Sequence, residues 1–169
     1  MKREYVGTFI VSLLVLGTVL SSGCLLFPDG SHPTKYIHDV FMSMHIDYDE
    51  VAEINYTMIK QYLEPKSDKV LTYLDDEYEP KTVDYGLDAW GYSNSSVGRF
   101  TIHISAWKYD NGTKDAGFTL ICYPNSEYED PNRVEDVKSH ARSIAIEIAD
   151  VCNLTLNWDN AKWTVNYGD

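Results

Sequence analysis

The sequence predicts an α+β domain in which an antiparallel sheet of about four strands packs against a long C-terminal helix. Apolar residues alternate in the middle of the chain, as they do in half-buried strands, and recur at helical spacing near its end. Two helical segments precede the alternating region and offer a cover for the second face of the sheet. We expect residues 35–169 to form this single domain.

Two helices are expected before the sheet. The first spans Tyr36 to Met44 and is moderately amphipathic. The second begins at Asp47-Tyr-Asp-Glu50, a sequence typical of a helix N-cap, and ends near Glu64 because proline follows. Its apolar residues share one side and need a surface to pack against: Val51, Ile54, Met58 and Tyr62.

Four segments with alternating apolar residues predict the strands. They cover about 82–89, 100–107 and 117–123, and a last strand holds Trp163, Val165 and Tyr167 on one face. Asp110-Asn-Gly112 marks a hairpin turn between the second and third strands.

The clearest helix begins at Pro131-Asn132 and extends to Cys152. A stripe of apolar residues predicts that one side of it is buried on the sheet. The stripe consists of Val134, Val137, Ala141, Ile144, Ala145, Ile148 and Cys152.

The N-terminus has the organisation of an export signal. Lys2 and Arg3 precede an apolar segment, which is most apolar over 8–20 and lacks charged residues from Tyr5 to Pro28. Small residues then lead to Cys24. A basic start, a short apolar segment and small residues before a cleavage site are typical of exported proteins.

The stretch Leu20-Ser-Ser-Gly-Cys24 resembles the lipobox of prokaryotic membrane lipoproteins, including some archaeal ones, although Ser21 stands where Leu or Val is usual. The resemblance implies that residues 1–23 are a signal peptide, that Cys24 carries a lipid, and that 24–34 tether the domain to the outer face of the cell membrane. Two alternatives stay open. The segment could remain uncut as a single N-terminal transmembrane anchor, or ordinary cleavage could release a soluble protein.

The charge of the chain limits its partners. Asp and Glu total 26 against 14 Lys and Arg, a formal net charge of −12. Such a surface argues against nucleic acid as a partner. The expected partners are the membrane, through the N-terminus, and a protein or carbohydrate ligand.

Cys122 and Cys152 remain once Cys24 is assigned to the anchor. Both fall on predicted core-facing positions, so we expect them to form a disulfide bond outside the cell, with two buried free thiols as the alternative. Asn94 and Asn111 lie in Asn-x-Ser/Thr sequences within expected loops and are the better candidates for glycosylation.

No catalytic signature is present in the sequence. It has no Gly-x-Ser-x-Gly motif, no phosphate-binding loop and no pair of histidines at ligand spacing. The acidic clusters do not reproduce a calcium-binding loop, and helix capping or solvation explains them. We therefore expect no metal and no cofactor, and interpret His103 as a surface histidine rather than a catalytic one.

Aromatic residues give the more suggestive signal. Trp90, Tyr92, Trp107 and Tyr109 fall near strand ends, where exposed rings could stack on a sugar or contact a protein. The alternative is that the N-terminal helices cover these rings. The favoured function is a membrane-anchored extracytoplasmic binding or accessory module. A small enzyme such as a hydrolase, using His103 with a carboxylate, and a purely structural envelope lipoprotein are the alternatives.

Overall fold

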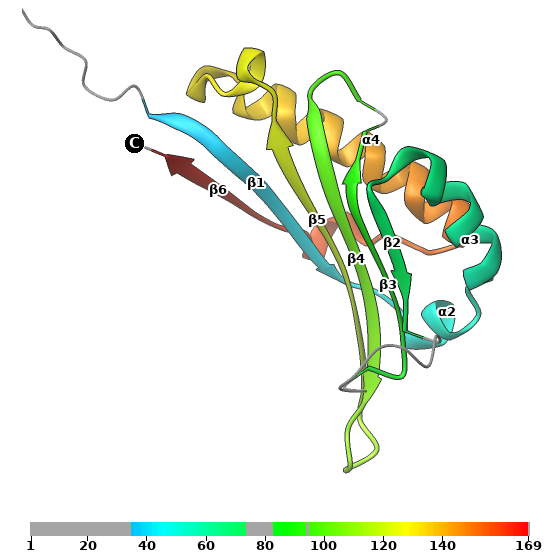
Figure 1. Cartoon of the computed structure of the whole chain (residues 1–169). Helices are drawn as coiled ribbons and strands as arrows, with labels where there is room; N and C mark the ends of the chain where they lie inside the picture. Colours follow the sequence, from blue (N-terminus) through cyan, green and yellow to red (C-terminus); the bar gives the residue numbers. More distant parts are fainter. Residues whose placement is uncertain (1–34, 74–82, 94, 169) are drawn as a thin grey trace, which may run out of the picture. The chain divides into compact units, whose positions relative to one another are not determined.

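Six antiparallel strands form one sheet in the computed structural model, in the spatial order β2-β3-β4-β5-β1-β6 (Figure 1). The structure describes residues 35–73, 83–93 and 95–168. The strands are β1 (Tyr36–His45), β2 (Lys69–Thr72), β3 (Tyr85–Tyr92), β4 (Gly98–Lys108), β5 (Lys114–Pro124) and β6 (Lys162–Gly168).

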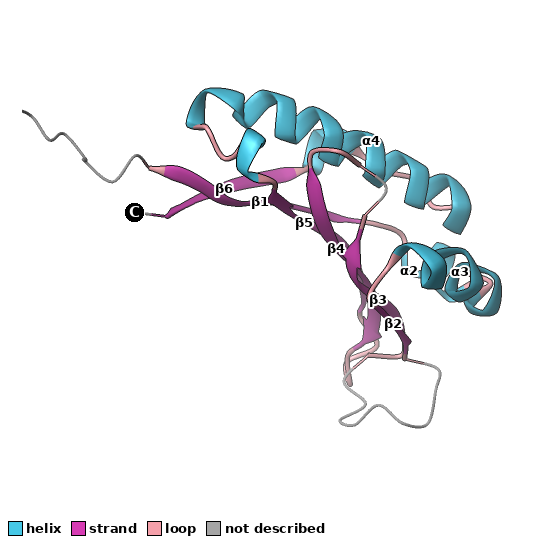
Figure 2. Ribbon diagram, turned by 45° about the horizontal axis from the view of Figure 1, so that its top comes forward, coloured by secondary structure: helices cyan, strands magenta, loops and turns pink. Residues whose placement is uncertain are grey.

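Three α-helices lie on the same side of this sheet, as Figure 2 shows. They are α2 (Tyr48–Ala52), α3 (Tyr56–Leu63) and α4 (Val134–Cys152). Their apolar residues join the core-facing residues of the strands in one buried cluster. We call the helix side the covered face, and the opposite side, where no described helix lies, the uncovered face.

Strand alternation assigns each side chain to one of these faces. On β5, Ala116, Phe118, Leu120 and Cys122 are fully buried under the helices, whereas the residues between them lie on the uncovered face. The register aligns the buried residues of neighbouring strands, so that Leu120 lies between Ile102 of β4 and Met42 of β1. The core is therefore a single layer between the sheet and the helices.

The α+β class and the four expected strands are confirmed, as β3, β4, β5 and β6, but the sheet has six strands rather than about four. The short edge strand β2 was missed. The segment 36–44, expected to be a helix, is the long strand β1.

A β-bulge explains the error at β1. The pairing of β1 with β6 shifts between Ile37 and Asp39, which adds one residue to β1. Ile37 and Val40 are consequently both buried although three residues separate them, and together with Met44 and with Phe41, which lies on the uncovered face, they reproduce the spacing of a helix although the backbone is extended. In so short a segment, the spacing of apolar residues cannot distinguish a helix from a strand that contains a bulge.

The second expected helix does begin at Asp47, whose side chain accepts hydrogen bonds from the backbone N–H groups of Asp49 and Glu50. It is broken before α3, because Asn55 caps a new helix by accepting a hydrogen bond from the N–H of Met58. The break changes which residues are buried: Ile59 and Leu63 enter the core, while Met58 is 49% exposed.

The expectation that N-terminal helices cover the second face of the sheet is wrong. One of them is β1, and α2 and α3 pack on the covered face beside α4 (Figure 2). The apolar stripe of α4 is buried from Val137 to Cys152, as predicted.

No helix within the described ranges combines the length and apolarity needed to cross a membrane. The predicted signal peptide, Cys24 and the tether lie outside the described residues.

Candidate functional site

The uncovered face carries a row of polar side chains that crosses the sheet. The register places Asp88 of β3 opposite His103 of β4, and His103 opposite Thr119 of β5. Thr119 in turn faces Ser43 of β1, which faces Lys162 of β6. Residues paired directly across a sheet share one face, and along each strand this face alternates with the core-facing one. All five side chains therefore point away from the helices.

A hollow of about 140 Å³ lies at the β1 and β6 end of this row. Strands β4, β5, β1 and β6 contribute to it, together with the short 3₁₀ turn Trp158–Asn160. A glycine on β5, Gly117, leaves it room, since a Cβ added there would meet no atom closer than 3.9 Å. The lining residues are Ser43, Met44, His45, Trp107, Gly117, Thr119, Asn160 and Lys162.

Trp107 is the aromatic residue of the hollow. Its ring is partly exposed and meets the exposed ring of Tyr109 edge to face, with centroids 6.4 Å apart. His45 lies on β1, two strands away from Trp107, and its Nδ1 is 3.1 Å from Oδ1 of Asp115, the β5 residue paired with Trp107 in the sheet. One side of the hollow is therefore aromatic and the other is polar.

Two polar groups in the hollow have no partner within the described part of the chain. The Oδ1 atom of Asn160 is buried and accepts no hydrogen bond, while its amide donates to the carbonyl oxygen of His45 at 3.4 Å. The ammonium of Lys162 forms no ion pair with the described carboxylates. A buried acceptor without a donor is uncommon and costs free energy, so a donor supplied by a ligand would relieve it.

The aromatic residues singled out in the sequence do not form one strip. Trp107 and Tyr109 lie together, but Trp90 lies near Thr101, about 20 Å along β4 from Trp107. Lys69 places its ammonium 5.3 Å from the centre of the Trp90 ring.

Tyr92, named in the sequence as a possible ligand contact with burial in the core as the alternative, does not lie on the uncovered face. It is fully buried on the covered face, and its hydroxyl donates a hydrogen bond to Glu147 of α4. Burial raises the pKa of the Tyr92 hydroxyl above its ordinary range, and the hydrogen bond to Glu147 adds to the effect. The β-bulge in β3 turns Tyr92 from the expected face into the core.

His103 and Asp88 form a second polar group on the uncovered face. The buried carboxylate of Asp88 contacts Nδ1 of His103 and accepts a hydrogen bond from the hydroxyl of Tyr73. With Nδ1 engaged, Nε2 of the half-exposed imidazole is left for solvent or a ligand. Sequence reasoning named His103 but not its partner, which comes from a different strand.

The predicted disulfide bond between Cys122 and Cys152 is absent from the structure, in which both residues are free thiols. Each side chain is buried in the core, as the periodicities predicted. Burial raises the pKa of both thiols from 9.0 to about 12.

The separation of the two thiols explains the absence of the bond. Cys122 pairs with Phe100 at one end of β4. Burial raises the pKa of the Tyr56 hydroxyl, and the nearby Cys152 and Tyr85 add to this effect; Tyr85 pairs with the other end of β4. These ends are about 20 Å apart, whereas a disulfide needs Cα atoms within about 7 Å. Periodicity predicts the face of a residue but not its position along the element.

Of the two predicted glycosylation sites, the structure describes only Asn111. Asn111 is exposed in the β4–β5 turn, where its side chain accepts a hydrogen bond from the backbone N–H of Thr113 at 2.9 Å. Asn94 lies outside the described residues. In the part of the chain that the structure describes, no three His, Cys, Asp or Glu side chains form a cluster that could hold a metal ion.

Comparisons with protein-family models, with curated proteins and with solved structures find no match to this chain.

Proposed function

We propose that the protein is a non-catalytic binding module of the cell surface that binds a neutral saccharide in the hollow beside Trp107. The export signal and the lipobox-like segment support a location at the outer face of the membrane, through a lipid on Cys24. The observation that carries the proposed ligand is the unpartnered Oδ1 atom of Asn160 beside a partly exposed indole ring.

The composition of the hollow favours a sugar over an apolar ligand. A pyranose has apolar C–H faces that stack on an indole and hydroxyl groups that both donate and accept hydrogen bonds. Asn160 would accept from such a hydroxyl, and the Lys162 ammonium would donate to another. The hydroxyls of Ser43 and Thr119 also line the hollow, and each can either donate a hydrogen bond to the sugar or accept one from it.

The size of the hollow favours one sugar ring rather than a large ligand. Pockets for drug-sized ligands measure roughly 300–1,000 Å³, against about 140 Å³ here. A ligand with so few contacting atoms gains little free energy, so we expect a Kd of about 1 mM for a monosaccharide. An oligosaccharide with further contacts along the uncovered face would bind more tightly.

Titration of the full-length chain in detergent with a panel of neutral mono- and disaccharides tests the proposal, with Trp fluorescence and NMR shifts as readouts. Trp107→Ala should abolish the response. Trp90→Ala is the matched control, because it removes a partly exposed indole from the other end of the same face. Equal binding by wild type and Trp107→Ala, or no binding of any saccharide, would contradict the proposal and favour a structural role.

The Asp88–His103 pair supports a second candidate function, a hydrolase in which His103 acts as general base. A buried carboxylate that holds Nδ1 orients the imidazole and leaves Nε2 for proton transfer. Assays with chromogenic esters and glycosides test this function. Turnover that is lost in His103→Ala and retained in His45→Ala would support it, and wild-type protein without turnover would exclude these substrates.

A further inference from the structure

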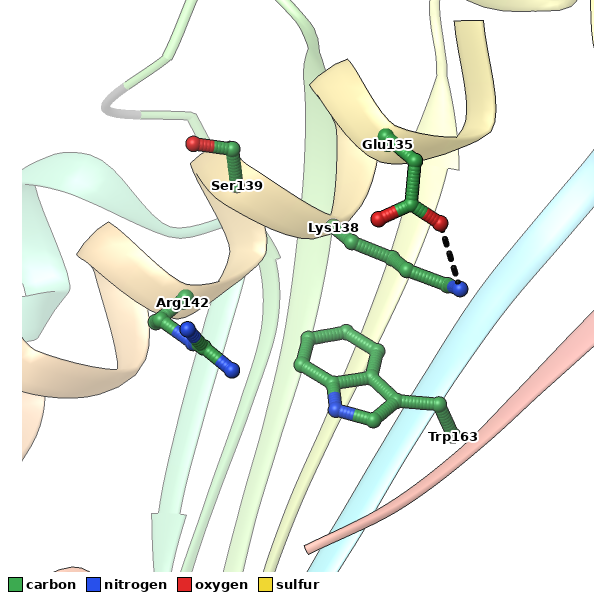
Figure 3. Close-up of a pocket in the computed structure, with 5 residues that line it drawn as sticks. All are labelled: Glu135, Lys138, Ser139, Arg142 and Trp163. Carbon is green, nitrogen blue, oxygen red and sulfur yellow. Dashed lines mark hydrogen bonds and ion pairs between the residues drawn. The ribbon is translucent and has the colours of Figure 1, made fainter. Parts of the chain in front are cut away.

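A second recess lies on the covered face, between α4 and the edge strand β6. Its volume is about 320 Å³. Four residues of α4 at helical spacing, Glu135, Lys138, Ser139 and Arg142, line one side, and Trp163 of β6 lines the other. We call it the α4–β6 groove (Figure 3).

The position of β6 explains why an indole is accessible there. Trp163 pairs with Met42 of β1 and points to the covered face, but β6 is the last strand of the sheet. The covered-face residues of β6 are less buried than those of β1: Trp163 is partly exposed and Tyr167 is 48% exposed, whereas Met42 is fully buried. In Figure 3 the ring of Trp163 lies between the side chains of Lys138 and Arg142.

The groove is locally basic on an acidic protein. Lys138 donates to Glu135 at 2.8 Å, an exposed pair that leaves other N–H donors of the ammonium free. Arg142 has no carboxylate partner among the described residues. Its guanidinium is instead 4.8 Å from the ring centre of Trp158, which supports the side chain and leaves its N–H groups for a ligand.

We propose that the α4–β6 groove binds a saccharide unit that carries a carboxylate, such as a uronic acid. The Arg142 fork matches a carboxylate and can donate two parallel hydrogen bonds to it. Trp163 offers a face on which the sugar ring stacks, and Glu135 can accept hydrogen bonds from sugar hydroxyls. A simple anion would need no aromatic surface, and a neutral sugar has no carboxylate to pair with the Arg142 fork.

This site is separate from the hollow beside Trp107, although the two share a strand. Lys162 and Trp163 are neighbours on β6 and therefore point to opposite faces of the sheet. The inference does not rest on the proposed function, and either site can be present without the other.

D-glucuronate is the probe that tests the groove, with D-glucose and acetate as the matched compounds that lack the charge or the ring. We expect NMR shifts in α4 and β6 with glucuronate, and affinity that falls as salt is added. Arg142→Gln should weaken glucuronate binding about tenfold or more. Arg99→Gln, which removes an exposed arginine outside the groove, should not.

Separate variants distinguish this site from the proposed function. Trp107→Ala should leave glucuronate binding unchanged, whereas Trp163→Phe should weaken it while retaining an aromatic residue at the groove. Three results would overturn the inference: unchanged glucuronate affinity in Arg142→Gln, acetate binding as tightly as glucuronate, or an acidic peptide binding the groove in preference to glucuronate. A circular dichroism spectrum of each variant confirms that it is folded.

Discussion

The hydroxyl of Tyr92 donates a hydrogen bond of 2.9 Å to Oε1 of Glu147, which joins β3 to α4 across the core. The same carboxylate accepts a hydrogen bond from Tyr62 of α3, and the ammonium of Lys66 lies 3.5 Å from it. One carboxylate on α4 thus connects a strand and a second helix.

Tyr92→Phe should therefore lower the free energy of unfolding by about 1–2 kcal/mol, since it removes a hydrogen bond to a charged acceptor without changing the packing. Urea unfolding followed by circular dichroism measures the change. Tyr109→Phe is the control: that residue is exposed, so the change should stay within about 0.5 kcal/mol. Equal effects of the two substitutions would show that the Tyr92 bond contributes nothing.

Asp88→Ala should destabilise the protein by about 1–3 kcal/mol, because the hydroxyl of Tyr73 and Nδ1 of His103 lose their common acceptor. Asp115→Ala removes the carboxylate from the more exposed pair with His45 and should cost at most about 1 kcal/mol. Urea unfolding of both variants under the same conditions makes the comparison. If Asp115→Ala lowered the free energy of unfolding more than Asp88→Ala, the result would contradict the conclusion that Asp88 is the more buried of the two carboxylates.

The two core thiols should be free and unreactive in the folded protein. A full-length Cys24→Ser variant retains only Cys122 and Cys152. Because burial raises the pKa of both to about 12, we expect no reaction with a thiol reagent at about pH 8 and two thiols after denaturation. If no thiol reacts with the reagent in denaturant without reductant, the two cysteines form the disulfide bond that the sequence predicted.

Alkaline conditions should destabilise the fold. A thiol whose pKa rises on folding favours the folded state below its unfolded pKa of 9.0, and this contribution is lost as pH rises towards 12. At about pH 10.5 the loss should be about 2 kcal/mol for each thiol. Buried Tyr56 has a raised pKa as well and acts in the same direction. Urea midpoints that stay constant from about pH 8 to 10.5 would refute this.

Mass spectrometry of the protein from its native membrane tests the N-terminal prediction. We expect a mature chain that begins at a lipid-modified Cys24. Cys24→Ser should prevent the modification and release the protein from the membrane fraction. An intact Met1 would indicate the uncut transmembrane anchor, and an unmodified Cys24 at the N-terminus would indicate release by ordinary cleavage.

The sequence predicted correctly those parts of the fold that depend on interactions between residues close together in the chain. The Asp47 cap and the buried stripe of α4 are of this kind, because a capping side chain or a helical period acts over one or two turns. The bulge between Ile37 and Asp39 is different. It depends on the pairing of β1 with β6, and no short window of sequence contains both strands.

The candidate site was predictable only in part for the same reason. Trp107 and Tyr109 carry a visible aromatic signal, and they do lie together. Asn160 and Lys162 carry none, because a polar residue in a turn or at a strand edge is usually just solvated. They line the same hollow as Trp107 only because β6 pairs with β1. This pairing is a feature of the tertiary structure that no local sequence signal indicates.

The place of β1 in the sheet has a consequence for the order of events during biosynthesis. This strand is made before the rest of the domain, yet its neighbours are β5 and β6, which are made near and at the end. Pairings so distant in sequence make folding slow, because long loops must close before contacts form. The sheet cannot be completed until β6 has been synthesised, so β1 has no strand partners while most of the domain is being made.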